Sequence, residues 1–179
     1  MFALTLKYIR GNRLPSFLES LRFPATRVSE ESAREKMGGG RPEFWEMVFW
    51  WTRKPLISAR CIIAGALLDE NTDLYDFYRI VRLDSKKVPH RENPRISHLR
   101  EKFSKIKLLD PFAGFGSIPL EAIRLGVGEV VAVEFLPVAY VFLKAVLEIP
   151  KWTVDKGLSE ELIKDVKKWG EWITKRLKE

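Results

Sequence analysis

Two carboxylates, Asp110 and Glu134, flank a glycine-containing turn and could hold a nucleotide cofactor. Asp110 opens the segment Asp-Pro-Phe-Ala-Gly-Phe-Gly-Ser, in which Gly114 and Gly116 let the backbone bend sharply and approach a ligand closely. An acidic residue about 20 positions beyond such glycines is where Rossmann-like folds bind the two hydroxyls of a ribose. These residues therefore predict a cradle for a nucleoside-containing cofactor.

The neighbouring elements predict how that cradle is positioned. Residues 105–109 form a short apolar run typical of a buried strand, and a second β-rich run at 129–134 ends in the second carboxylate. Between them, Ser117 is expected to cap a helix that tolerates Pro119 in its first turn and closes at Gly126. The order strand, glycine turn, helix, strand predicts a parallel βαβ unit.

Two segments carry a family resemblance. Residues 110–117 and 133–140 (Val-Glu-Phe-Leu-Pro-Val-Ala-Tyr) resemble the S-adenosylmethionine-binding motif of amino-group DNA methyltransferases. The chain is similar, more narrowly, to large archaeal and bacterial adenine-specific DNA methylases with an N-terminal DUF1156 domain of unknown function. The hallmark of that domain, Trp-Trp-x-Arg-(Arg/Lys)-Pro-Leu, stands at 50–56 as Trp-Trp-Thr-Arg-Lys-Pro-Leu. The resemblance covers roughly residues 17–151.

The resemblance implies S-adenosylmethionine as cofactor and assigns roles to residues around the cradle. Asp110 would meet the methionine moiety, Glu134 the ribose, and Phe135 the adenine, while Phe115 either packs on the adenosine or fills a neighbouring gap. The helix expected from Leu56 would present its start to the cofactor carboxylate, unless the charges there only decorate a surface turn. The implied cofactor-binding residues are Asp110, Pro111, Phe112, Ala113, Gly114, Gly116, Glu134, Phe135, Thr52, Arg53 and Lys54.

The catalytic motif of these methyltransferases is missing from the sequence. That motif, (Asp/Asn)-Pro-Pro-(Tyr/Phe), accepts hydrogen bonds from the target amino group and stacks on the flipped base, but the sequence contains no Pro-Pro pair. We therefore expect the cofactor-binding part of an adenine-N6-type DNA methyltransferase that is inactive alone, with no catalytic residue assigned. It would be one subunit of a split enzyme, a non-catalytic nucleic-acid-binding module, or a self-associating remnant of a disrupted gene.

Charge and motif order divide the chain into two regions. The expected fold is α/β: a helical, basic N-terminal region at 1–104, with a loop-rich linker at 79–104, precedes a truncated Rossmann-like methyltransferase domain at 105–179. Residues 1–107 hold 21 Lys and Arg against 13 Asp and Glu, whereas 108–179 hold 10 against 11. A basic linker predicts phosphate contacts with DNA, or simply a solvated loop. The candidate nucleic-acid residues are Arg79, Arg82, Lys86, Lys87, Arg91, Arg95 and Arg100.

Other residue types narrow the class of protein. Cys61 is the single cysteine and lies in an apolar run, which predicts a buried thiol and a reducing compartment. His90 and His98 lack a cysteine partner, so no metal site is expected. No apolar run is long enough to cross a membrane, which predicts a cytoplasmic protein. The absence of glutamine and the abundance of Lys, Arg and Glu favour a thermophilic source.

Two further helices are expected towards the C-terminus. Residues 139–148 are apolar almost all round, which predicts a buried helix ending before Pro150. Residues 159–179 carry one apolar stripe, which predicts packing on the chain's own core or an interface with a partner. The stripe comprises Leu162, Val166, Trp169, Ile173 and Leu177.

Overall fold

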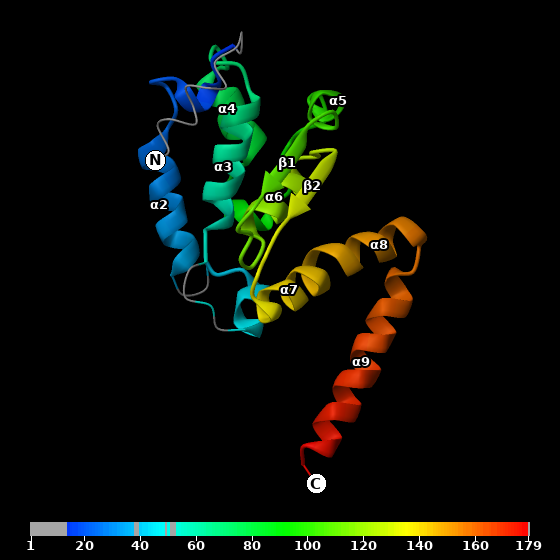
Figure 1. Cartoon of the computed structure of the whole chain (residues 1–179). Coiled ribbons are helices and arrows are strands. Elements are labelled where there is room, and N and C mark those ends of the chain that lie inside the picture. The colour runs from blue at the N-terminus through cyan, green and yellow to red at the C-terminus, as the bar shows by residue number, and fades with distance from the viewer. Residues whose placement is uncertain (1–13, 38–39, 49, 51–52, 179) are drawn as a thin grey trace.

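The computed structural model describes residues 14–37, 40–48, 50 and 53–178. It is a mixed α/β structure, mostly helical, with one pair of parallel strands (Figure 1). The elements are, in order, a 3-10 helix (Phe17–Glu19), α2 (Ala25–Lys36), a 3-10 helix (Glu43–Met47), α3 (Leu56–Leu67), α4 (Leu74–Val81), a 3-10 helix (Pro89–Arg91), α5 (Arg100–Phe103), β1 (Lys107–Asp110), α6 (Ser117–Arg124), β2 (Glu129–Ala132), α7 (Pro137–Leu143), a π-helical segment (Lys144–Glu148), α8 (Ile149–Lys156) and α9 (Ser159–Arg176).

The predicted strand, turn, helix, strand order is confirmed as β1, α6 and β2. The strands pair in parallel, and the pairing ends with Asp110 opposite Ala132. Alternate residues face opposite sides of a strand: Leu108 packs on the main core, whereas Leu109 is 63% exposed. One face of the sheet is therefore covered, chiefly by α6, and the other face is open.

One hydrophobic core joins the N-terminal helices to the βαβ unit. Its fully buried members include Phe17, Phe77 and Phe103 from the N-terminal region and Leu125 from the end of α6. Residues on both sides of position 105 thus share the same core, so the two regions of the sequence pack as neighbours. Cys61 lies in this core, as predicted, and burial raises the pKa of its thiol.

A buried ion pair holds α3 against α6. The Arg60 guanidinium donates from Nε to Glu121 Oε2 at 2.6 Å and from Nη2 to Oε1 at 3.2 Å, and both residues are 0% exposed. The same guanidinium donates to the carbonyl oxygens of Val81, at 3.1 Å, and Pro89, at 3.0 Å. The linker after α4 is therefore fixed to α3 by hydrogen bonds that a buried charge requires.

Ser117 is not the cap of α6, which corrects the sequence expectation. Gly116 occupies the N-cap position with φ 79°, a left-handed conformation that glycine adopts without strain. The Ser117 hydroxyl, already inside the helix, donates to the carbonyl oxygen of Lys54 at 2.7 Å. The serine therefore ties the segment before α3 to the start of α6. The predicted closure at Gly126, with φ 75°, is observed.

The helix expected at 139–148 neither ends before Pro150 nor is buried all round. The π-helical segment after α7 leads directly into α8, where Pro150 lies in the first turn and its missing N–H is tolerated. Ala139 and Phe142 are buried, but Val141 is 64% exposed because α7 and α8 contact the rest of the molecule along one side only.

Helix α9 does not pack on the core, so that expectation is also wrong. It extends away from the sheet and the N-terminal helices (Figure 1). None of the residues Ser159–Arg176 is buried. Among the residues that the structure describes, no helix is both long and apolar enough to cross a membrane.

Candidate cofactor-binding site

The two predicted carboxylates lie at the same end of the parallel strands. Asp110 is the last residue of β1, and Glu134 follows β2 by two positions. The Val133 N–H donates to the Asp110 carbonyl at 2.9 Å, and the Ala113 N–H donates back to the Val133 carbonyl at 3.0 Å. The glycine loop is therefore held at the carboxyl edge of the sheet, where α/β folds bind ligands.

Glu134 already organises the loop. Its Oε2 accepts the Gly114 N–H at 2.7 Å, while Oε1 accepts the N–H groups of Phe135 at 2.8 Å and Leu136 at 2.9 Å. These bonds, led by that from Leu136, lower the pKa of the carboxyl group below its ordinary value. Three donors fill three of the about four acceptor positions of a carboxylate, so one further donor, such as a hydroxyl, can bind.

Asp110 carries an unsatisfied oxygen. The residue is 6% exposed, and its Oδ1 accepts the Phe112 N–H at 3.2 Å. Its Oδ2 is buried and has no hydrogen-bond partner among the described residues. An unpaired buried carboxylate oxygen costs free energy, so a ligand that donates a proton or carries a positive charge would fit here.

Arg53, in contrast, carries buried hydrogen-bond donors that lack an acceptor. Both terminal nitrogens of its guanidinium are buried without a hydrogen-bond partner in the described part of the chain. The group lies over the rings of Phe115, at 5.2 Å, and Trp45, at 5.7 Å, where cation–π attraction supports its charge. Burial lowers the pKa of the guanidinium. A carboxylate is the group that would satisfy both nitrogens at once.

Phe115 fills a hydrophobic gap, which decides between the two sequence alternatives. Its ring centroid lies 4.5 Å from that of Trp50 and 4.2 Å from that of Phe142, and the residue is 6% exposed. The left-handed Gly116 serves the same packing, because a Cβ there would come within 2.6 Å of Leu143 Cδ2. Gly116 therefore admits α7, and Phe115 holds the aromatic cluster beneath Arg53.

The remaining cofactor residues are distributed around this loop. The Lys54 carbonyl accepts the Ser117 hydroxyl, so the structure places Arg53 and Lys54 beside the loop. Ala113 is buried and Pro111 is exposed, while Phe112 and Phe135 are 81% and 93% exposed where the two strands end. Thr52 lies outside the described residues.

The start of α3 is already capped by another part of the chain. The Leu56 and Ile57 N–H groups donate to Glu35 at 2.6 and 2.9 Å. These donors at the start of the helix are therefore used by an internal carboxylate, and Arg53, beside it, is the cationic group whose terminal nitrogens lack a partner among the described residues. Sequence reasoning missed Glu35, because nothing local marks a carboxylate that caps a helix beginning 21 residues later.

Several basic residues of the linker are paired. Arg82 donates to Glu92 at 2.5 and 2.9 Å, and Arg95 to Asp84 at 3.1 Å. Arg79 lies 3.7 Å from Asp76, and Arg91 belongs to the 3-10 helix of the linker. Three candidates form no ion pair with the described residues, namely Lys86, Lys87 and Arg100. A polar cleft of about 520 Å³ is lined by Arg79, Arg95, His98 and Arg100, among others.

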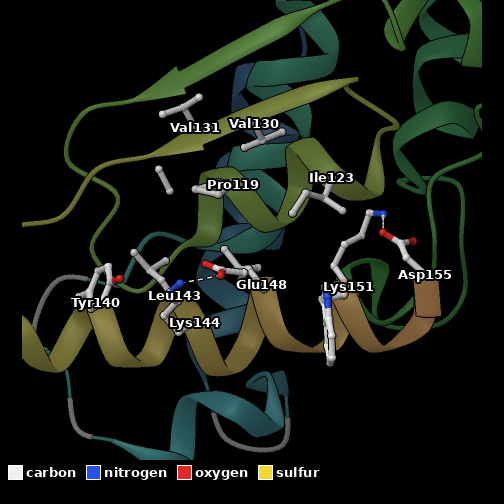
Figure 2. Close-up of a pocket in the computed structure, with 13 residues that line it drawn as sticks. Pro119, Ile123, Val130, Val131, Tyr140, Leu143, Lys144, Glu148, Lys151 and Asp155 are labelled. Carbon is white, nitrogen blue, oxygen red and sulfur yellow. Dashed lines mark hydrogen bonds and ion pairs between the residues drawn. The ribbon is translucent and has the colours of Figure 1, made fainter. Parts of the chain in front are cut away.

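An apolar cavity of about 510 Å³ lies elsewhere, between α6, the edge of β2 and the α7–α8 arm (Figure 2). Pro119, Ile123 and Leu143 line it. Its charged residues pair with one another, as in Lys144 with Glu148 at 2.5 Å. None of the candidate cofactor residues lines this cavity, so it is separate from the loop.

The fold and the loop define a mixed α/β protein with a glycine turn at the carboxyl end of its parallel strands. Residues 22–98 match the family model described as "Protein of unknown function (DUF1156)". This match supports placing that part of the chain, which includes Arg53 and α2 to α4, in the DUF1156 family. It ends before β1. No curated protein and no solved structure matches the chain.

Proposed function

We propose that this chain is the S-adenosylmethionine-binding part of an adenine-N6-type DNA methyltransferase with a Rossmann-like core. One observation carries the proposal: two unsatisfied buried groups of opposite charge, Asp110 Oδ2 and the Arg53 guanidinium, flank one glycine loop. A zwitterionic amino-acid group supplies the matching ammonium and carboxylate. The resemblance of residues 110–117 and 133–140 to the methyltransferase motif supports the same ligand.

Each residue then has a binding role. Asp110 accepts from the ammonium of the methionine moiety, and Arg53 donates to its carboxylate. Glu134 uses its remaining acceptor position for a ribose hydroxyl, and the exposed Phe135 beside it offers an apolar contact to the adenine. The cofactor, when bound, supplies the electrophilic methyl group, and these residues hold and orient it.

No residue of this chain is assigned to the target amino group. That role belongs to the (Asp/Asn)-Pro-Pro-aromatic motif in related methyltransferases, and the 179 residues contain no Pro-Pro pair. We propose that polypeptide outside these 179 residues supplies the motif. The open face of the parallel pair, where Leu109 and Val131 are 63% and 44% exposed, is in keeping with a sheet face that further polypeptide covers.

Binding to DNA phosphates is the second part of the proposal, and without catalysis it is also the alternative function. The cleft lined by Arg79, Arg95, His98 and Arg100 favours an anionic partner. Duplex binding should weaken with salt, and combined substitution of Lys86, Lys87 and Arg100 by alanine should reduce the salt slope by about one unit per lost phosphate contact. Fluorescence anisotropy across a salt series measures this. An unchanged slope would remove these residues from the interface.

A calorimetric titration with S-adenosylmethionine tests the cofactor proposal. The wild-type chain should bind saturably, and Asp110→Asn and Arg53→Met should each lose at least about tenfold in affinity, as expected when a charged hydrogen bond worth about 1.5–3 kcal/mol is removed. Glu129→Gln is the matched control, because this carboxylate lies at the opposite end of β2 and is paired with Lys107 at 2.6 Å. No binding at millimolar ligand by the folded protein would overturn the proposal.

A further inference from the structure

Helix α9 presents an apolar stripe that the described residues leave exposed, apart from Leu162, which is half-buried. Val166, Trp169 and Ile173 are 64%, 53% and 51% exposed, and Leu177 beyond the helix end is 82% exposed. Soluble proteins rarely leave large contiguous apolar patches uncovered. The spacings along the stripe are four, three, four and four residues, close to the spacing of three and four that forms the seam between paired helices.

The stripe is symmetric about a point between residues 169 and 170. Leu162 and Leu177 lie equally far from this point, and so do Val166 and Ile173. Trp169 and Gly170 form the central pair. If two copies of the helix run antiparallel about this midpoint, leucine meets leucine, valine meets isoleucine, and each tryptophan meets a glycine. An interface of this kind is self-complementary, as two-fold symmetry requires.

A glycine at position 170, in the interior of α9, has no packing reason within an isolated helix. Glycine in a helix interior costs about 1 kcal/mol relative to alanine. The backbone there is not left-handed, and a Cβ added at Gly170 would meet no atom within 4 Å. The absence of a side chain at this position instead leaves a depression into which the indole of an opposing Trp169 fits.

The charges on α9 complement each other in the same arrangement. Its first turn is acidic and its last turn basic, so antiparallel pairing brings unlike ends together. On one flank of the stripe, Asp165 of one copy falls beside Arg176 of the other. This contact occurs twice by symmetry.

We propose that α9 mediates homodimerisation by antiparallel pairing with α9 of a second copy of this chain, with the two-fold axis beside Trp169 and Gly170. The helix of 18 residues is about 27 Å long, which allows pairing along the whole stripe. The apolar cavity between β2 and the α7–α8 arm is a different surface and is not used. The dimer is independent of cofactor binding.

Sedimentation equilibrium of the full chain over a concentration series tests the proposal. The wild type should show a monomer–dimer equilibrium, and Trp169→Asp should be monomeric at every concentration. Asp165→Arg and Arg176→Asp should each weaken the dimer, and the double variant should restore it. Rescue is specific to the proposed register, because these residues are 11 positions apart on one helix and do not contact each other within a chain. A monomeric wild type, or a double variant weaker than both single variants, would overturn the proposal.

Cysteine cross-linking tests the direction of pairing. The single native thiol, Cys61, is buried, so an introduced cysteine reports on its own position. Under oxidation Gly170→Cys should form a covalent dimer, because the two copies of this residue meet near the axis, whereas Leu177→Cys should not. Efficient linkage at position 177 would indicate parallel pairing, and linkage at neither position would place the contact outside α9. Either result contradicts the proposed dimer.

Discussion

The α3–α6 interface and helix α9 differ in the kind of side chain that stands in an unfavourable environment. At the interface, Arg60 and Glu121 are charged yet 0% exposed, and each has several partners within hydrogen-bond distance. On α9, Trp169 and Ile173 are apolar yet 53% and 51% exposed. The comparison contrasts buried charges that are paired within the chain with exposed apolar side chains that, in our proposal, a second copy of the chain covers.

The glycine loop between β1 and α6, where we propose that the cofactor binds, combines both situations. It is held in place by Glu134 and by the aromatic cluster around Phe115, yet it leaves one oxygen of Asp110 and the Arg53 guanidinium unsatisfied. Unsatisfied buried groups persist where a ligand completes them. Among the described side chains, the remaining buried polar atom without a hydrogen-bond partner is His90 Nε2, which lies away from this loop.

The largest effect on stability is expected from removing one member of the buried ion pair. Glu121→Ala should lower the free energy of unfolding by about 3–5 kcal/mol, because Arg60 is left charged and buried. Urea denaturation measures this change, and Arg60→Met combined with Glu121→Leu should be much less harmful. Exposed Glu161→Ala on α9 is the control. A loss below about 1 kcal/mol in Glu121→Ala would contradict a self-contained interface.

Titration of two buried groups near that interface should give opposing pH dependences. Burial raises the pKa of Glu35 from 4.5 to about 7, so its contribution to stability is full below pH 4.5 and lost as the pH rises to about 7. Burial, helped by Arg91 and Arg60, lowers the pKa of His90 from 6.5 to about 4, so its contribution is full above pH 6.5 and lost as the pH falls to about 4.

The two effects oppose each other in the wild type between pH 4.5 and 6.5. His90→Gln should therefore lose up to about 3 kcal/mol of stability as the pH rises across this window, and Glu35→Gln should lose a similar amount as it falls. Chemical denaturation at several pH values checks both slopes. Slopes of the same sign in the two variants would show that these groups do not titrate as described.

Substitutions at the cofactor loop should separate stability from binding. Asp110→Asn and Arg53→Met remove unsatisfied buried charges, so the melting temperature should hold or rise, although ligand affinity falls. Differential scanning calorimetry without ligand provides the measurement. A drop of several degrees in both variants would mean that the two charges support the fold.

Substitutions on α9, in contrast, should have little effect on the stability of the monomer. Trp169→Ala should change the unfolding free energy of the monomer by about 0.5 kcal/mol or less, since its side chain packs on no other element of the described chain. Denaturation at a concentration too low for dimerisation isolates this value. A loss above about 2 kcal/mol would show that the indole packs on its own chain.

Local patterns predicted the βαβ unit and the position of both carboxylates where the two strands end. Strand alternation, glycine turns and the spacing of the acidic residues are encoded over short distances in the sequence. They did not predict Arg60 as a buried partner, although it is the sole charge within the apolar helix α3. Only the packing of α3 on α6 supplies Glu121, which is 61 residues away. Ser117 and Pro150 misled for a related reason, since the conformation of the preceding backbone decides whether such residues cap or end a helix.

The most direct test compares S-adenosylhomocysteine with 5′-methylthioadenosine, which lacks the amino-acid end, on the wild type, Asp110→Asn and Glu134→Gln. The account predicts that the wild type binds the complete ligand at least about tenfold more tightly, as expected for two charged hydrogen-bonding groups. Asp110→Asn should remove most of that difference and leave methylthioadenosine binding unchanged, whereas Glu134→Gln should weaken both ligands. Equal wild-type affinities, or an Asp110→Asn variant that weakens both ligands alike, would contradict the assignment of this loop.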